Sequence, residues 1–311
     1  MQKILITGGT GFAGTHLLKA LQKRDTEDEI HLTSLHEHQL PGVQVHALNL
    51  IDAAAVEKLI QDIQPDQIYH LASLAGVADS FKDPQTVINN NFQLTLNVLE
   101  AVRKFAPQAK ILLISSAEIY KPNLEGRPIA EDGLLEPSNP YAASKAAQDL
   151  LASAYGQSFN LNIVRARPFN HIGPGQNKGF VVADFASQIA AIEKDDQIHE
   201  IKVGNLKAAR DFTDVDDMMR AYILLMEKGA RGEVYNIGRG QAIKIQAILD
   251  QLLALAHKKI DVIIDQERLR PIDIPTIVAD NRKIAALGWQ AEVPLEETLA
   301  HILEDWRDKM V

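Results

Sequence analysis

The segment that most constrains the fold is a glycine-rich loop near the N-terminus. It runs from Thr7 to Gly14 and directly follows the short aliphatic run Lys3–Thr7. Glycines at positions 8, 11 and 14 allow a tight turn, close approach of the backbone to a pyrophosphate, and close packing of the next helix. The start of that helix offers N–H groups and partial positive charge to phosphates. The loop therefore predicts a strand–loop–helix unit that binds a dinucleotide.

Short aliphatic runs alternate with helical patterns through the first half of the chain. Five of these runs are predicted to be buried strands: Lys3–Thr7, Ile30–Ser34, Gln67–His70, Lys110–Ser115 and Leu161–Ala166. Residues with helical periodicity lie between them. This order predicts an α/β fold of the Rossmann type, in which helices cover both faces of a doubly wound parallel sheet.

The pattern changes after residue 168, where a loop rich in glycine, proline and asparagine leads into mixed short elements. We therefore expect two domains. Residues 1–168 plus 211–240 are predicted to form a Rossmann domain that binds NAD(P). Residues 169–210 and 241–311 are predicted to form a smaller α/β domain that binds the substrate.

Composition excludes several kinds of chemistry. The 311 residues include no cysteine, so disulfides, thiol nucleophiles and thiolate metal sites are excluded. The formal net charge of −9 argues against a nucleic-acid partner. No apolar run approaches the roughly 20 residues that span a bilayer, and the N-terminus lacks the pattern of a secretory signal. We expect a cytoplasmic protein without a membrane partner, and the histidine spacing predicts no metal site.

The choice between NADP and NAD depends on the end of the second predicted strand. The segment Leu32–His36 holds no carboxylate that would bind the ribose 2′-hydroxyl of NAD. Thr33, Ser34 and His36 can instead donate hydrogen bonds to a 2′-phosphate, so NADP is favoured and NAD stays possible. Asn49 lies in Leu48–Leu50, between the predicted strands Ile30–Ser34 and Gln67–His70, where it would either read the adenine edge or form a turn.

A second motif predicts the catalytic group. Tyr141 and Lys145 lie four residues apart at the start of the predicted helix Tyr141–Gln157, so their side chains share one helical face. An ammonium beside a phenol lowers the pKa of the tyrosine, which can then exchange protons with a carbonyl or carbinol oxygen. Ser115 and Ser116, at the end of a predicted strand, supply a partner hydroxyl. Together with the glycine loop, these residues predict an NAD(P)-dependent oxidoreductase.

These motifs resemble those of the extended short-chain dehydrogenase/reductases that act on nucleotide sugars. The resemblance covers nearly the whole chain, and further matches are His70–Ala72, Asn91, Ser115–Tyr120 and Arg167–Asn170. The second half is most similar to the members that reduce GDP-4-keto-6-deoxy-D-mannose. The segments that carry this similarity are Phe169–Gln176, Lys202–Leu206, Arg210–Val215 and Leu269–Pro271.

The resemblance implies a reaction and a set of contacts. The C4 ketone of GDP-4-keto-6-deoxy-D-mannose would be reduced with NAD(P)H to a GDP-6-deoxyhexose such as GDP-D-rhamnose, in a homodimer. The implied catalytic residues are Ser116, Tyr141 and Lys145, with Glu118 beside them. The expected cofactor contacts are Gly8, Gly11, Phe12, Gly14, Thr33, Ser34, Asn49, Leu50, Ala72, Asn91, Ser115, Tyr141 and Lys145. The expected substrate contacts are Asn170, Arg210, Arg270 and Asp273.

Glu118 keeps a second reaction open. Related 4,6-dehydratases move protons with acidic residues just after the catalytic hydroxyl, and those acting on GDP-mannose keep only this glutamate. Ile172–Gln176 lacks their arginine-rich stretch, and the short loop Leu35–Pro41 lacks their basic residues, which favours a reductase. A nucleotide-sugar 4-epimerase is a further alternative.

A protein that only senses NADP is an alternative from another class. A sensor has no need of a proton donor, so the intact set of Ser116, Tyr141 and Lys145 argues against it.

Overall fold

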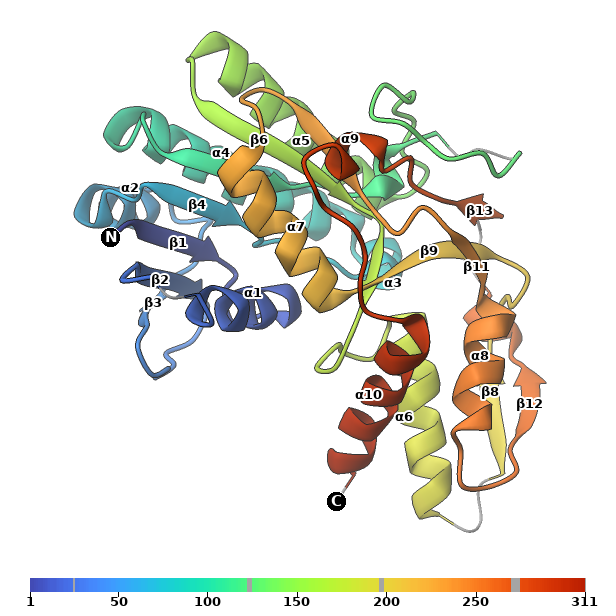
Figure 1. Cartoon of the computed structure of the whole chain (residues 1–311). Helices are drawn as coiled ribbons and strands as arrows, with labels where there is room; N and C mark the ends of the chain where they lie inside the picture. The colour runs from blue at the N-terminus through green and yellow to red at the C-terminus, as the bar shows by residue number, and fades with distance from the viewer. Residues whose placement is uncertain (25, 122–124, 196–198, 270–274, 311) are drawn as a thin grey trace.

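The centre of the computed structural model is a parallel sheet of seven strands in the order β10-β6-β5-β4-β1-β2-β3 (Figure 1). The strands are β1 Lys3–Thr7, β2 Glu29–Ser34, β3 Gln44–Ala47, β4 Gln67–His70, β5 Lys110–Ile114, β6 Asn162–Pro168 and β10 Val234–Ile237. The structure describes residues 1–24, 26–121, 125–195, 199–269 and 275–310. The order reverses between β1 and β4, and parallel sheets bind ligands at such a point. The expected doubly wound Rossmann fold is confirmed.

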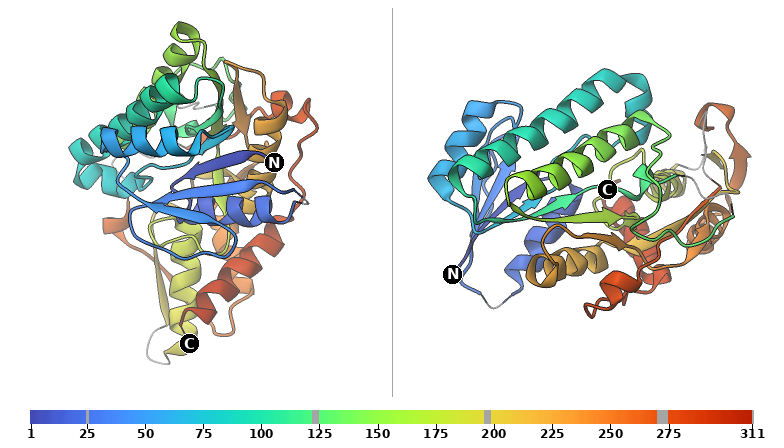
Figure 2. Two further views of the ribbon diagram at one scale, coloured as in Figure 1. Left: turned by 90° about the vertical axis from the view of Figure 1, so that its left-hand side faces the viewer. Right: turned by 90° about the horizontal axis from the view of Figure 1, so that it is seen from above.

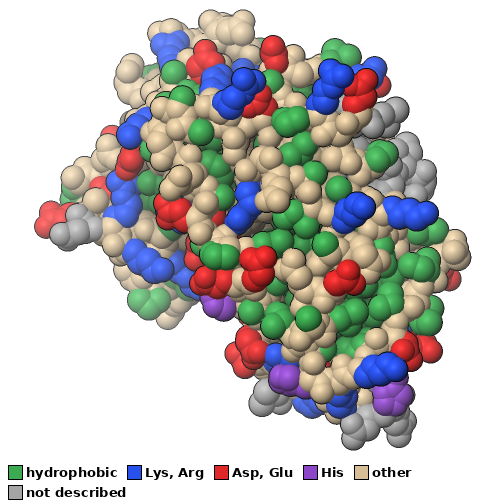
Figure 3. All heavy atoms as spheres, turned by 45° about the vertical axis from the view of Figure 1, so that its right-hand side comes forward, with side chains coloured by type: hydrophobic (Ala, Val, Ile, Leu, Met, Phe, Trp, Pro, Cys, Tyr) green, Lys and Arg blue, Asp and Glu red, His purple; other side chains and the backbone are tan. Residues whose placement is uncertain are grey.

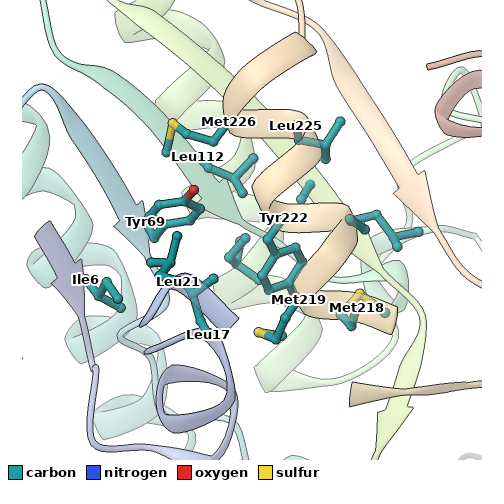
Figure 4. Close-up of a cluster of buried hydrophobic side chains, with 14 of the residues drawn as sticks. Ile6, Leu17, Leu21, Tyr69, Leu112, Met218, Met219, Tyr222, Leu225 and Met226 are labelled. Carbon is teal, nitrogen blue, oxygen red and sulfur yellow. The ribbon is translucent and has the colours of Figure 1, made fainter. Parts of the chain in front are cut away.

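Helices cover both faces of this sheet (Figure 2). One face carries α1 Phe12–Gln22 and α7 Val215–Lys228; the other carries α2 Ala53–Ile63, α4 Pro84–Phe105 and α5 Pro140–Ser158. Burial on both sides explains the continuous aliphatic run in β1. Ile4 and Ile6 pack in the cluster beneath α1 and α7, shown in part in Figure 4, whereas Leu5 packs beneath α2 and α4. Each such side chain contributes roughly 1.5–3 kcal/mol by leaving water.

A smaller α/β part follows the large sheet. Its helices are α6 Val181–Lys194, α8 Ile245–Ala254 and α10 Leu295–Asp308, which share one hydrophobic cluster. Its strands are β7 Asn170–Ile172, β8 Glu200–Val203, β9 Ala209–Asp214, β11 Ala242–Lys244, β12 Asp261–Ile264 and β13 Thr276–Ile277. The remaining short helices are α3 Val77–Lys82, η1 Ala117–Ile119, η2 Gln266–Arg268 and α9 Arg282–Ala285. The smaller part lies beside the carboxyl edge of the large sheet, so the two can line one site (Figure 1).

The chain passes between the two parts more than once. β9 begins two residues before the predicted boundary at 211, and it pairs with β7, β11 and β13 of the smaller part. Ile284 and Trp289, from the segment assigned to the substrate domain, pack in the cluster beneath α1 and α7. The predicted division at residues 168, 210 and 240 stays a prediction. Within the described residues, no helix is both long and apolar enough to cross a bilayer.

A substitution at Gly14 tests how closely α1 must approach the glycine loop. A Cβ atom there would lie 2.5 Å from the Gly8 oxygen and 2.7 Å from the Gly9 Cα. We expect Gly14→Ala to lower the free energy of unfolding by about 1–3 kcal/mol, because the helix must move away from the loop. The control is Gly156→Ala on α5, where the nearest atom lies 3.8 Å away. It should stabilise by about 0.5–1 kcal/mol. Urea denaturation measures both, and equal stabilities would contradict the account.

Candidate active site

A cavity of about 790 Å³ follows the carboxyl ends of the parallel strands and continues into the smaller part. The glycine loop and the ends of β2, β5 and β6 line one half, and the start of α6 and the end of β8 line the other. On the face drawn in Figure 3, acidic and basic side chains are interspersed. Among the described residues on this face no broad basic surface is available, so a phosphate in the cavity would be bound by individual groups that line it (Figure 3).

The glycine loop has the geometry of a phosphate cradle. Gly8 adopts φ +68°, a conformation that favours glycine, and its carbonyl accepts a hydrogen bond of 3.0 Å from the Gly11 N–H. Gly11 precedes α1 without a side-chain cap, so the first N–H groups of the helix are not occupied by a capping side chain. A Cβ atom at Gly8 would lie 2.9 Å from the Ala72 Cα, so the loop also packs tightly on the segment after β4. These residues fit a pyrophosphate.

Thr33 and Ser34, at the end of β2, play different parts in the structure. The Thr33 hydroxyl accepts a hydrogen bond of 3.1 Å from the Gly8 N–H, so this side chain holds the glycine loop. The Ser34 hydroxyl accepts from the Thr10 hydroxyl at 3.1 Å and from the His36 N–H at 3.2 Å, and its own hydrogen remains available to a ligand. Residues 33–50 are all described, and none of those lining the cavity is acidic.

Asn49 and Leu50 line the same end of the cavity. The Asn49 side-chain oxygen accepts a hydrogen bond of 3.1 Å from the Ile51 N–H, which is the turn-forming role. The NH2 group of the Asn49 side chain remains available to donate a hydrogen bond to an adenine base. Leu50 packs its side chain in the core, and its carbonyl accepts 2.9 Å from Asn97 Nδ2. Asn97 is a positioning residue that the sequence did not reveal, because a polar residue within a helix ordinarily faces solvent.

Ser116, Tyr141 and Lys145 come together at the end of β5. Ser116 and Tyr141 both line the cavity, and Ser116 is among the side chains that influence the pKa of the Tyr141 hydroxyl. Asn139 caps α5 through a 2.8 Å bond from the Ala142 N–H and so fixes the start of the helix beside Tyr141. Lys145 Nζ donates a 2.6 Å hydrogen bond to the Ile114 carbonyl, the last of the strand.

Burial shifts the pKa values of the pair in opposite directions. Burial raises the pKa of Tyr141 to about 12. Ser116 acts in the opposite direction, and the charge of Glu118 adds to the increase. Burial lowers the pKa of Lys145 to about 7, although the negative charge of Asp149 acts in the opposite direction. The expectation that Lys145 lowers the pKa of Tyr141 is therefore wrong for the protein without a cofactor. Tyr141 stays a neutral phenol at neutral pH, which suits a proton donor.

Buried ion pairs hold the helix that carries Tyr141 and Lys145 against the sheet. Asp149, one turn after Lys145, is fully buried and accepts from Arg165 at 2.8 Å and from Arg167 at 2.9 Å. Both arginines belong to β6, so they join α5 to the sheet. The Ser115 hydroxyl donates to the Lys145 carbonyl at 3.5 Å, and it is one of the groups that lower the pKa of Asp149.

Asn91 also acts inside the protein. Its side chain is fully buried on α4, accepts 2.7 Å from the Leu74 N–H, and donates 2.9 Å to the Ser144 hydroxyl. It therefore ties the segment after β4 to α5. Ala72 lines the cavity, whereas Asn91 is not among the lining residues, and its contact with a cofactor stays a prediction.

Two of the expected substrate contacts line the other half of the cavity. Asn170 begins β7, and Arg210, 9% exposed, lies on β9. Arg270 and Asp273 lie outside the described residues. Further polar lining residues, which the sequence did not single out as contacts, include Gln176, Asp184, Lys202 and Arg268. Of these four, Gln176 and Lys202 had a signal, since they lie in the segments that carried the resemblance.

Phe12 and His171 join the two halves of the cavity. Their rings stack in parallel with centroids 5.9 Å apart, so the cofactor loop contacts the segment after Asn170 directly. Burial lowers the pKa of His171 to about 4, so the ring is neutral. No group of three or more His, Cys, Asp or Glu residues placed to hold a metal occurs among the residues that the structure describes.

The fold and the site together define the class of the protein. A doubly wound sheet with a glycine loop at its first turn, and with Ser116, Tyr141 and Lys145 at its carboxyl edge, is that of an extended short-chain dehydrogenase/reductase. The family model described as GDP-mannose 4,6 dehydratase matches residues 5–302, and the chain belongs to this family.

Individual relatives resemble the chain over its full length. The GDP-6-deoxy-D-mannose reductase of Pseudomonas aeruginosa is 32% identical over 311 residues, which cover 99% of this chain and 98% of the relative. The structure of RMD from Pseudomonas aeruginosa in complex with NADPH has a TM-score of 0.88 at 32% identity and covers 99% of this chain and 100% of its own. The UDP-glucose 4-epimerase of Thermus thermophilus in complex with NAD has a TM-score of 0.87 at 28% identity, with 98% and 99% covered.

The pKa of Lys145 predicts a dependence of stability on pH. Its folded value of about 7 lies below the value of about 10.4 in an unfolded chain, so the unfolded state binds more protons between these pH values. Stability should therefore rise with pH across this window. We expect the free energy of unfolding of the natural protein, relative to Lys145→Met, to increase by about 2 kcal/mol between pH 7 and pH 9. Urea titrations without cofactor measure this, and parallel pH profiles would contradict it.

Proposed function

We propose that the chain reduces the C4 ketone of GDP-4-keto-6-deoxy-D-mannose with NAD(P)H and forms a GDP-6-deoxyhexose such as GDP-D-rhamnose. The observation that carries the proposal is that Ser116, Tyr141 and Lys145 line one cavity together with the glycine loop. The similarity to a GDP-6-deoxy-D-mannose reductase over 99% of the chain supports the substrate class.

The side chains divide the acid–base work. When bound, a reduced nicotinamide supplies a hydride to the ketone carbon. Tyr141, neutral below a pKa of about 12, donates its proton to the oxygen on which charge develops. Ser116 donates a hydrogen bond to the same oxygen, and this interaction strengthens as the charge grows. Lys145, once protonated, stabilises the phenolate that remains.

We propose NADP as the cofactor, with NAD possible. Ser34 and the neighbouring His36 offer donors to a 2′-phosphate, and no lining carboxylate at this end repels it. The Pseudomonas aeruginosa structure holds NADPH, and the Thermus thermophilus epimerase holds NAD, so the family accommodates both. Gly8, Gly11, Phe12 and Gly14 would hold the pyrophosphate. The other proposed cofactor contacts are Thr33, Asn49, Leu50, Ala72, Asn91 and Ser115.

Asn170 and Arg210 are the proposed contacts for the diphosphate and the nucleotide, with Arg270 and Asp273 in the same role outside the described residues. In this account residues 1–168 plus 211–240 bind the cofactor, and residues 169–210 and 241–311 bind the sugar nucleotide. The single cavity that both parts line supports this division.

A GDP-mannose 4,6-dehydratase is the second candidate because of Glu118. Its carboxylate lines the cavity beside Tyr141 and accepts 3.3 Å from Asn139 Nδ2. A base in this position could move a proton during loss of water. The same carboxylate raises the pKa of Tyr141, so it also serves a reductase by keeping the phenol protonated.

A homodimer is a further proposal. Exposed apolar side chains on two adjacent helices support it: Ile88 and Phe92 on α4, 36% and 37% exposed, and Leu150 on α5, 57% exposed. Burying them against a second copy would remove this surface from water.

The test of the function is a set of turnover measurements. We expect GDP-4-keto-6-deoxymannose to consume NADPH and GDP-mannose alone to remain unchanged. Tyr141→Phe should lower kcat by about 10²- to 10⁴-fold and leave NADPH binding nearly intact, because only the proton donor is lost. Tyr155→Phe is the matched control on the same helix: its hydroxyl bonds Glu100 outside the cavity, so turnover should be kept.

Two results would exclude this function. Conversion of GDP-mannose without added reductant would identify a dehydratase, and interconversion of C4-epimeric nucleotide sugars would identify an epimerase. Unchanged turnover in Tyr141→Phe would remove this residue from the mechanism.

A further inference from the structure

Tyr222 is a buried phenol on the cavity wall that none of the roles above uses. It lies on α7, is 0% exposed, and is one of the residues that line the cavity. Its hydroxyl has no hydrogen-bond partner within the described part of the chain. A buried hydroxyl without a partner costs roughly 1–3 kcal/mol, so most such groups in proteins are paired. A missing partner beside a ligand cavity indicates that a ligand supplies it.

The position of α7 shows which part of a ligand that would be. α7 covers the face of the sheet opposite α5 and packs against β5 and β6 (Figure 2). Tyr222 belongs to the same cluster as Ile114 and Ala166, near the ends of these two strands. Burial raises the pKa of Tyr222, so its phenol is neutral at neutral pH. Tyr141 and Tyr222 both line the cavity, and the helices that carry them lie on opposite faces of the sheet.

The reacting ketone must lie against Tyr141 and Ser116, and the ring that gives up the hydride must contact it. The nicotinamide therefore belongs at the ends of β5 and β6, the two strands against which α7 packs. Its carboxamide carries a carbonyl oxygen that accepts hydrogen bonds, and Tyr222 is a neutral donor. We propose that the Tyr222 hydroxyl donates a hydrogen bond to the nicotinamide carboxamide of the bound cofactor and so fixes the orientation of the ring. This inference rests on the proposed function, since it requires a nicotinamide cofactor.

Tyr69 provides an internal comparison. It lies in the same hydrophobic cluster, on β4, is 0% exposed, and also has a hydroxyl without a partner in the described residues (Figure 4). It does not line the cavity. A buried unpaired phenol alone therefore does not indicate a ligand contact; the position on the cavity wall distinguishes Tyr222.

The experiment compares two ligands that differ only in the nicotinamide. Dissociation constants of NADPH and of ADP-ribose 2′-phosphate, which lacks that ring, are measured by titration for the natural protein, Tyr222→Phe and Tyr69→Phe. We expect Tyr222→Phe to bind NADPH about three- to tenfold more weakly, the loss of one neutral hydrogen bond, and to bind ADP-ribose 2′-phosphate unchanged. Tyr69→Phe should change neither affinity.

Melting temperatures provide a readout that does not depend on turnover. Without cofactor, both variants should be at least as stable as the natural protein, because each loses an unpaired buried hydroxyl. Saturating NADPH should raise the melting temperature less in Tyr222→Phe than in Tyr69→Phe.

Three results would overturn the inference. The first is unchanged NADPH affinity in Tyr222→Phe, and the second is an equal loss of affinity for both ligands. The third is a lower melting temperature without cofactor, which would reveal a structural partner for the hydroxyl. If the natural protein binds no NADPH and does not reduce the keto sugar, the proposed function fails, and the inference fails with it.

Discussion

The site depends on the hydrogen bond from Lys145 Nζ to the Ile114 carbonyl, 2.6 Å long and fully buried. This bond fixes the start of α5 against the last residue of β5, and so sets the distance between Tyr141 and Ser116. Below it, Asp149 pairs with Arg165 and Arg167 and ties the same helix to β6. Removing one partner from such a buried cluster typically costs about 3–5 kcal/mol, so α5 has little freedom to shift.

Burial of this group also selects the chemistry. In water the amine would be charged, and the phenol would have a pKa near 10. Inside the protein the phenol is held neutral and the amine is close to its titration point at neutral pH. The neutral phenol can give its proton to the ketone oxygen as that oxygen gains charge, and a protonated Lys145 would stabilise the phenolate that remains.

The sequence predicted the large sheet well because its strands are buried on both faces. β1 and β4 have the predicted bounds, since Gly8 directly follows the first aliphatic run and Pro65 lies two residues before the second. The smaller strands were harder to predict. β13 has two residues and forms only by pairing with β9, and all four residues of β12 are exposed, so it has no apolar alternation.

Spacing along the sequence predicted the pair Tyr141 and Lys145, whereas the resemblance to a family predicted the substrate contacts. A separation of four residues on a helix places Tyr141 beside Lys145 wherever the helix lies. The direction of the tyrosine pKa shift was missed because it depends on burial by distant segments. Tyr222 was missed for a related reason: its helical periodicity marks it as a core residue, and only the structure shows that it reaches the cavity.

The central claim is that a ketone held against Tyr141 takes its hydride from a nicotinamide cofactor whose pyrophosphate the glycine loop would hold. NADPH deuterated at C4 of the nicotinamide, on the face that is transferred, tests this directly with GDP-4-keto-6-deoxymannose as substrate. The account predicts a GDP-6-deoxyhexose with one deuterium at C4 of the sugar, detected by NMR and mass spectrometry. A product without deuterium at C4, or with deuterium elsewhere in the sugar, would contradict it.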